Sequence, residues 1–132
     1  MRAPAAALLH PALRVEVLLE VPEAKFLNGV ARISGVEAPK FDDTESTFPE
    51  LKARIQKTLD YLASVPNERI DGTEDKEITF PVGRDKSRTM KGEAYLKHFV
   101  LPNFYFHLTT AYGLLRHNGV PLGKPDFLGR IA

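Results

Sequence analysis

The spacing of apolar residues predicts two amphipathic helices in the first half of the chain. In residues 23–34, apolar side chains recur every three or four positions, and Gly35 follows where a C-terminal cap belongs. Residues 47–65 repeat this spacing, and Pro66 ends it. The face of the second helix that we expect to be buried consists of Phe48, Leu51, Ile55, Leu59 and Leu62. Each helix is therefore expected to pack one side against a core.

The start of the second helix has a recognisable sequence pattern. Thr47 is a favourable N-cap, Pro49 suits the first turn, and the carboxylate of Glu50 can reach back to the cap. The acidic run just before it, residues 42–45, is interpreted as a solvated loop beside the positive end of the helix dipole.

A short β-hairpin is predicted after the second helix. Residues 77–80 and 87–90 are strand-like segments on either side of a turn that contains Pro81 and Gly83. A hairpin alone is only marginally stable in water, so this one is expected to lie against the helices.

The longest helix is predicted over residues 91–118, where Gly119 supplies a left-handed cap. Its widest apolar sector consists of Leu101, Phe104, Leu108, Ala111 and Leu115. Because other sides of this helix are apolar as well, it is expected at the centre of a bundle with its polar groups paired inside. Pro102 removes a backbone hydrogen bond and predicts a kink near residues 98–101.

These elements place the chain in the all-α class, mainly helical with one hairpin before the last long helix. Residues 12–21 fit a strand or a helix, and the pattern leaves both open. The tail after residue 119 is expected to wrap back, anchored by Phe127 and Leu128. A length of 132 residues and the absence of repeats predict one domain over residues 1–132.

Composition and charge argue against some classes of binding partner. The formal net charge is +1, with 18 basic and 17 acidic residues, which argues against nucleic acid or an anionic membrane as a partner. The chain has no cysteine, so it has neither disulfides nor cysteine-bound zinc. No apolar run has the length of a membrane span, and the N-terminal one stops at His10 and Pro11. A cytoplasmic protein is expected.

Three histidines on the last helix are the first candidates for chemistry. His98 and His107 are nine residues apart, which puts them on opposite faces of a regular helix, whereas helical metal ligands are usually three or four residues apart. Only Asn103 and His107 have that spacing, and an amide is a poor ligand for transition metals. We therefore predict no metal site and no cofactor. His107 is the best candidate for an acid or base, and a hydrogen-bonded core histidine is the alternative.

A ligand site beside the last long helix is the leading interpretation. Its predicted residues carry polar groups on a mostly apolar helix, a combination typical of small-molecule sites. They are Asn103, Tyr105, His107 and Tyr112, with His98 next. Packing with a solvated rim is the alternative for the tyrosine row, which continues to Arg116.

Residues 101–112 (LPNFYFHLTTAY), followed by Leu115 and Arg116, resemble the signature of a family catalogued as domain of unknown function nineteen-ninety-three. Supporting stretches lie at residues 35–39, 47–51 with 54–55, and 123–129. The family is grouped with the DinB/YfiT-like metalloenzymes, so the resemblance implies a DinB-like four-helix bundle over residues 23–129. Residues 1–22 form an atypical N-terminal segment, which leaves an incomplete first helix as an option.

The resemblance also implies a metal site that these residues do not reproduce. Metal-binding relatives use three histidines, two of them in an H-x-x-x-H pair on the last helix. Here Pro102 is four residues after His98, and Ala111 is four residues after His107. An open apolar seam on residues such as Ile55 and Leu108 would be covered in a homodimer, which we predict as an alternative to marginal stability.

Three functions remain open at this point. The first is a DinB-like protein that binds an unknown small molecule. The second is a divalent-metal-dependent hydrolase or thiol transferase using His98 and His107. The third is a non-catalytic protein-interaction module. DNA binding is the weakest option, because no helix is rich in Arg and Lys.

Overall fold

A computed structural model describes residues 26–129 of the chain. The prediction for residues 12–21, the atypical segment 1–22 and His10 fall outside these residues. The described elements are a helix over residues 26–34, α2 (Phe48–Ser64), a 3-10 turn (Asn67–Arg69), strands β1 (Glu77–Pro81) and β2 (Ser87–Lys91), and helices α3 (Gly92–Tyr95), α4 (Leu101–His117) and α5 (Lys124–Leu128). A π-helical segment, Leu96–Val100, joins α3 to α4 in one long helix.

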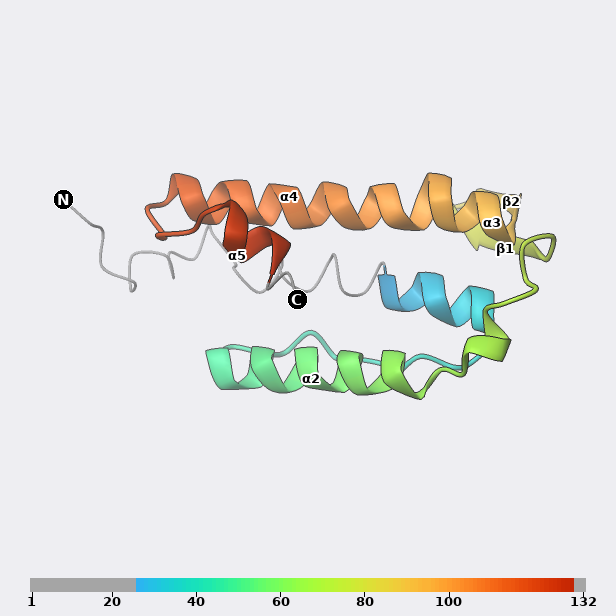
Figure 1. The fold of residues 1–132 in the computed structure, drawn as a ribbon, viewed down its shortest axis with the longest axis horizontal. Coiled ribbons are helices and arrows are strands. Elements are labelled where there is room, and N and C mark those ends of the chain that lie inside the picture. The colour runs from blue at the N-terminus through green and yellow to red at the C-terminus, as the bar shows by residue number, and fades with distance from the viewer. Residues whose placement is uncertain (1–25, 130–132) are drawn as a thin grey trace.

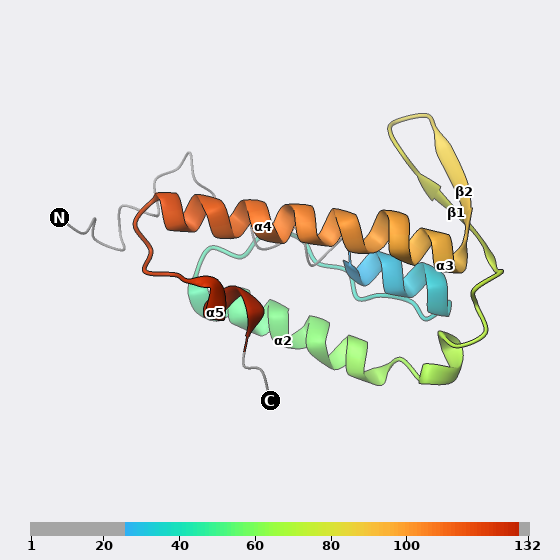
Figure 2. The ribbon, with the colours of Figure 1, turned by 45° about the horizontal axis from the view of Figure 1, so that its top comes forward.

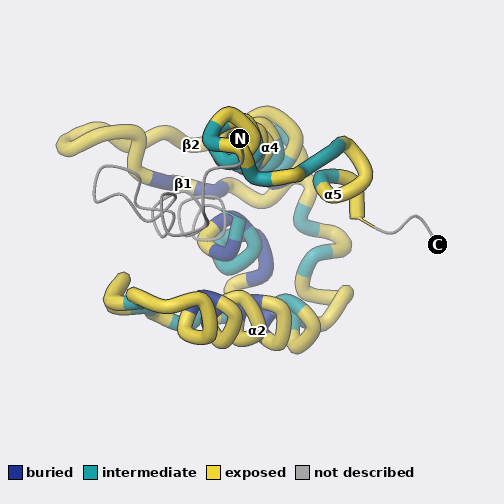
Figure 3. The backbone as a smooth tube through the Cα atoms, turned by 90° about the vertical axis from the view of Figure 1, so that its left-hand side faces the viewer, coloured by how far each residue is buried: buried dark blue, intermediate teal, exposed yellow. Residues whose placement is uncertain are grey.

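The helices lie in layers along one long axis. In Figures 1 and 2 the helix over residues 26–34 (blue) lies between α2 and the long helix that contains α3 and α4. Buried residues lie on this middle helix, on β1 and on the inner side of α2, whereas the outer sides of α2 and α4 are exposed (Figure 3). The mainly helical class with one hairpin before the last long helix is confirmed.

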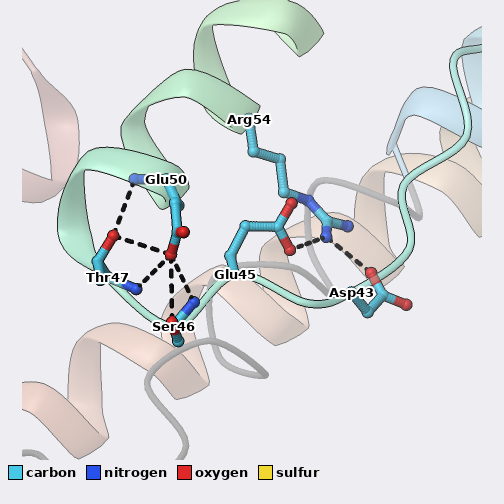
Figure 4. Close-up of polar contacts among 6 residues, drawn as sticks. All are labelled: Asp43, Glu45, Ser46, Thr47, Glu50 and Arg54. Atoms are coloured by element: carbon cyan, nitrogen blue, oxygen red, sulfur yellow. Dashed lines mark hydrogen bonds and ion pairs between the residues drawn. The ribbon is translucent and has the colours of Figure 1, made fainter.

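The capping box predicted for α2 is present. The Thr47 hydroxyl accepts a hydrogen bond from the Glu50 backbone N–H at 3.4 Å, and Glu50 Oε2 accepts from the Thr47 backbone N–H at 2.8 Å (Figure 4). The Ser46 backbone N–H also donates to Glu50 Oε2, at 2.9 Å. The bond from Ser46, followed by those from Thr47, lowers the pKa of the Glu50 carboxyl.

The predicted buried face of α2 is wrong in most of its positions. Its buried residues are Leu51, Arg54, Thr58 and Tyr61. Phe48, Ile55 and Leu59 are instead 58%, 41% and 53% exposed. Compared with the prediction, α2 is rotated about its axis, because polar contacts turn the face that carries Arg54 and Tyr61 inward. Arg54 is bonded to two carboxylates in the preceding loop, and the Tyr61 hydroxyl donates to the Val36 carbonyl at 2.8 Å.

The hairpin forms within one residue of its predicted bounds. β1 and β2 are antiparallel, with Ile78 opposite Met90 and Phe80 opposite Arg88. The predicted packing against the helices is also present, because Phe80 contacts the rings of Tyr95 and Phe99 at centroid distances of 4.6 and 4.4 Å.

The main core lies where the hairpin meets the helices. We call it the hairpin-end core: Ile33, Ile78, Phe80, Tyr95 and Val100. It occupies the end of the molecule where α3 begins (Figure 1). The helix over residues 26–34 approaches closely here, since a Cβ built on Gly29 would lie 2.5 Å from a γ-methyl of Val100. Toward the other end, the ring of Phe26 packs against that of Phe104 at a centroid distance of 5.1 Å, with the two ring planes tilted by 48°.

The irregularity expected around Pro102 takes the form of a π-helical segment in place of a sharp kink. The Leu101 N–H donates to the Leu96 carbonyl, five residues back, and Pro102 follows as the second residue of α4. Pro102 has no N–H to continue that ladder, and a π segment accommodates such a break. The ribbon runs on in one direction through it (Figures 1 and 2).

The long helix is less central than predicted. Within α4 only Ala111 is buried, and much of the helix faces outward (Figure 3). The tail does return along it, as Phe127 meets the ring of Tyr112 at 5.5 Å. Leu128, the second predicted anchor, is exposed. The helix over residues 26–34 lies between α2 and the long helix (Figures 1 and 3). Because α2 is on the far side of that middle helix, it does not cover the sides of α4 that face away from it.

Candidate functional site

The five predicted site residues lie on two sides of the long helix. Asn103 and His107 are half-buried and one turn apart. Tyr105 and Tyr112, at ~100° per residue, lie on the opposite side of α4. His98 is exposed in the π-helical segment. The structure thus brings Asn103 and His107 together and keeps this pair apart from the two tyrosines, so the five residues do not gather on one side of the helix.

The polar contacts differ between the two sides. The Arg116 Nη1 donates to the Tyr112 hydroxyl at 3.1 Å on an exposed surface. The side chains of Asn103 and His107 have no hydrogen-bond partner within residues 26–129, and the His107 ring meets only the edge of Phe106 at 5.2 Å. Half-buried polar groups without a partner are costly to hold, so this pair is the more informative side.

Two hollows are formed by described residues in other places. One, of about 360 Å³, lies between the helix over residues 26–34 and the loop 36–40. The other, of about 210 Å³, lies between residues 41–45 and the start of α2. The residues lining these two hollows do not include the predicted ones on α4.

Two ion pairs made by the buried Arg54 lie at the second hollow, and the apolar spacing of the sequence does not predict them. Arg54 is 3% exposed, and its Nη1 donates to Asp43 Oδ1 at 2.7 Å and to Glu45 Oε2 at 3.0 Å (Figure 4). The guanidinium also lies over the Phe41 ring, 4.4 Å from its centroid. The interpretation of residues 42–45 as only a solvated loop is therefore wrong for Glu45. The sequence contains a signal for the burial of Arg54, since this residue is three positions after Leu51 and shares its face of the helix.

The fold defines this protein as a mainly helical bundle with a hairpin before its longest helix. The chain belongs to the family described as Domain of unknown function (DUF1993), whose model matches residues 18–128. It is similar to the crystal structure of a DinB family member from Shewanella denitrificans, with 35% sequence identity and a TM-score of 0.79. That likeness covers 98% of this chain and 70% of the Shewanella chain. No curated protein matches the chain.

These comparisons confirm the resemblance and the DinB-like bundle fold. They assign no ligand or reaction. In the part of the chain that the structure describes, no helix combines the length and apolar character needed to cross a membrane.

The residues present do not fit the three-histidine metal site implied by the superfamily. Between residues 26 and 129, no group of three or more His, Cys, Asp or Glu side chains is arranged to hold a metal ion. His98 is exposed, whereas His107 is half-buried on another side of the helix. We therefore derive no chemical step through a metal.

Proposed function

We propose that this DinB-like protein binds a small molecule beside its last long helix, through Asn103 and His107. The supporting observation is that these two half-buried side chains, one turn apart, have no hydrogen-bond partner among residues 26–129. An amide and an imidazole together offer both donors and acceptors. A ligand that satisfies them removes the cost of leaving them unpaired, which is about 1–3 kcal/mol for a fully buried group.

The proposed ligand is uncharged and polar at one end. The side chain of Asn103 is uncharged, and the adjoining side chains on the inward face, Phe104 and Leu108, are apolar and half-buried. A hydroxyl or carbonyl group would contact the polar pair, and an apolar body would lie along these neighbours. Tyr105, Tyr112 and His98 belong to the flanking surface in this proposal.

The test is retention of small molecules by purified protein. The protein is dialysed against a bacterial metabolite extract, separated by rapid gel filtration, and the retained compounds are identified by mass spectrometry. We expect at least one compound to be retained by the native chain and by His117→Phe, an exposed control on the same helix. His107→Phe and Asn103→Leu should lose it while keeping their helical circular dichroism. Equal retention by all four proteins, or by none, contradicts the proposal.

The enzymatic alternative has a separate readout. A divalent-metal-dependent hydrolase or thiol transferase requires stoichiometric zinc, nickel or iron in protein purified without an affinity tag. Ligand retention that depends on Asn103 and His107 requires no metal, so elemental analysis of the same sample distinguishes the two.

A further inference from the structure

The larger hollow is built by a reversal of the chain at the end of the helix over residues 26–34. Asn28, Ala31 and Arg32 lie on one face of that helix, and the loop from Val36 to Lys40 forms the opposite wall. Gly35 has φ +73°, a left-handed conformation that permits the reversal. A volume of about 360 Å³ is within the range of small-molecule sites.

Three hydrogen bonds hold these walls in place. The Val36 N–H donates to Ser34 Oγ at 3.1 Å, and the Tyr61 hydroxyl of α2 donates to the Val36 carbonyl at 2.8 Å. Burial raises the pKa of the Tyr61 hydroxyl, which keeps it protonated as a donor. Lys76 Nζ donates to the Ile33 carbonyl at 2.8 Å and so compensates the negative end of the helix dipole. The hollow is therefore pre-formed, with its loop fixed from two sides.

Arg32 is the unusual residue of this hollow. Its side chain is half-buried, and its Nη1 donates to the hydroxyl of Tyr95, a fully buried residue, at 3.0 Å. Within the described residues it makes no ion pair. Arg54 shows the usual arrangement, since it is buried against two carboxylates. An arginine carries several N–H donors in a planar fork, so Arg32 retains donors for an anion.

The other charges of the hollow also favour an anion. Lys40 is a second cation on the wall, and Glu37 is the one acidic residue of the lining. Both are exposed, so each acts through solvent and weakly. The remaining wall contains one polar residue, Asn28, and is otherwise apolar or small, with residues such as Ala31, Val36 and Pro39. This combination suits a molecule with a carboxylate at one end and a short apolar body.

We infer that this hollow binds a small organic carboxylate, with its carboxylate on the guanidinium fork of Arg32 and its apolar body against Ala31 and Pro39. Lys40 adds attraction, and Glu37 opposes it. Tyr95 is a positioning residue, because its hydroxyl accepts a hydrogen bond from Arg32 and so orients the guanidinium group. The site shares no residue with the proposed site on α4, so either can fail without the other.

The test is a titration of the isotope-labelled protein followed by amide chemical shifts. The probes are hexanoate and benzoate, and the matched uncharged probes are hexanamide and benzamide. We expect saturable shifts at the amides of Ala31, Arg32 and Val36 with the carboxylates only. Arg32→Gln should weaken binding about tenfold or more, since a charge-assisted pair is lost. Arg88→Gln, which removes an exposed cation on β2, should leave the affinity unchanged.

Two milder variants keep the inference testable if Arg32→Gln does not fold. Lys40→Gln should weaken hexanoate binding by about threefold, and Glu37→Gln should strengthen it by a similar factor, because both groups are solvent-screened. Equal shifts with carboxylates and amides would overturn the inference. So would an affinity for hexanoate that none of the substitutions at Arg32, Lys40 and Glu37 changes.

Discussion

The two ends of the long helix differ in how much of the molecule surrounds them. At the α3 end, Tyr95 and Val100 are buried among the hairpin and the helix over residues 26–34. Toward the other end of α4, only Ala111 is buried, and Phe106 is 66% exposed. One helix of continuous sequence thus contributes to a close-packed core and to an open surface. The residues that stabilise this helix and the polar groups that it leaves available therefore lie in separate places.

The polar groups follow the same division. At the α3 end, the Tyr95 hydroxyl accepts a hydrogen bond from Arg32. One to two turns beyond the π-helical segment, Asn103 and His107 have no partner within residues 26–129. Core packing requires buried polar groups to be satisfied, whereas a binding surface leaves donors and acceptors for the ligand. Substitutions at the α3 end are therefore expected to affect stability most, and the proposed ligand is expected to bind beside α4, beyond the π-helical segment.

The largest effect is expected from Phe80→Ala. This side chain is 1% exposed and contacts Tyr95 and Phe99, so its removal leaves a cavity in the hairpin-end core. We expect a loss of about 3–5 kcal/mol in the free energy of unfolding. Urea denaturation followed by circular dichroism measures it. A loss below about 1 kcal/mol would show that this end is not the main core.

The next effect is expected from Gly29→Ala. The added Cβ would lie 2.5 Å from a γ-methyl of Val100, whose branched side chain cannot easily move aside. We expect a loss of about 1–3 kcal/mol from overpacking. The double variant Gly29→Ala, Val100→Ala should show a coupling that recovers part of this loss, measured by a double-mutant cycle. Simple additivity of the two changes would contradict the close contact.

A smaller effect is expected from the cap of α2. Thr47→Ala removes the hydroxyl that accepts from the Glu50 N–H, and we expect a loss of about 1 kcal/mol. Thermal denaturation measures it, and Ser64→Ala, at the other end of the helix, is the control. An unchanged melting temperature would show that the loop before α2 supports the helix without the cap.

Glu50 gives this cap a pH dependence. Hydrogen bonds from Ser46 and Thr47 lower its pKa in the folded protein below the unfolded value. Its contribution is therefore fully present above the unfolded pKa and is lost as the pH falls through the folded one. Glu50→Gln should destabilise the chain more at pH 7 than at pH 3, as measured by urea denaturation at both values. The same difference at both pH values would contradict the cap's role.

The smallest effect is expected on the open side of α4. Phe106→Ala removes a large apolar side chain that is mostly in solvent, and we expect a change within about 0.5 kcal/mol. The same urea measurement applies, with Phe80→Ala as its counterpart. A loss comparable to that of Phe80→Ala would mean that another surface covers this ring in solution.

Local signals predicted local structure well. The Thr47 and Glu50 capping box, the hairpin bounds and the end of the long helix before Gly119 depend on residues close in sequence. Which face of α2 is buried depends on distant groups, because Arg54 and Tyr61 bond to the loop before the helix. Apolar spacing therefore selected the wrong face. The π-helical segment also shifts the angular positions of the residues that follow it, and a constant helical spacing does not predict this shift.

The candidate sites show the same limit. Helical spacing predicts that Asn103 and His107 are neighbours, and the structure has them one turn apart. It does not predict that Arg32 makes no ion pair with the residues that the structure describes. Nor does it predict that residues 36–40 fold back beside Arg32, since Gly35 and Tyr61 together produce that hollow. Half-buried charges without ion pairs become visible only when the chain is folded.

Hydrogen exchange of backbone amides tests the difference between the two ends of the long helix most directly. The hairpin-end core should exchange only through global unfolding, so amides of residues 95–100 and of β1 should be the most protected. Amides of residues 109–117 should exchange at least ~100-fold faster through local opening. Equal protection along the whole helix would contradict the account, because both ends would then unfold as one unit.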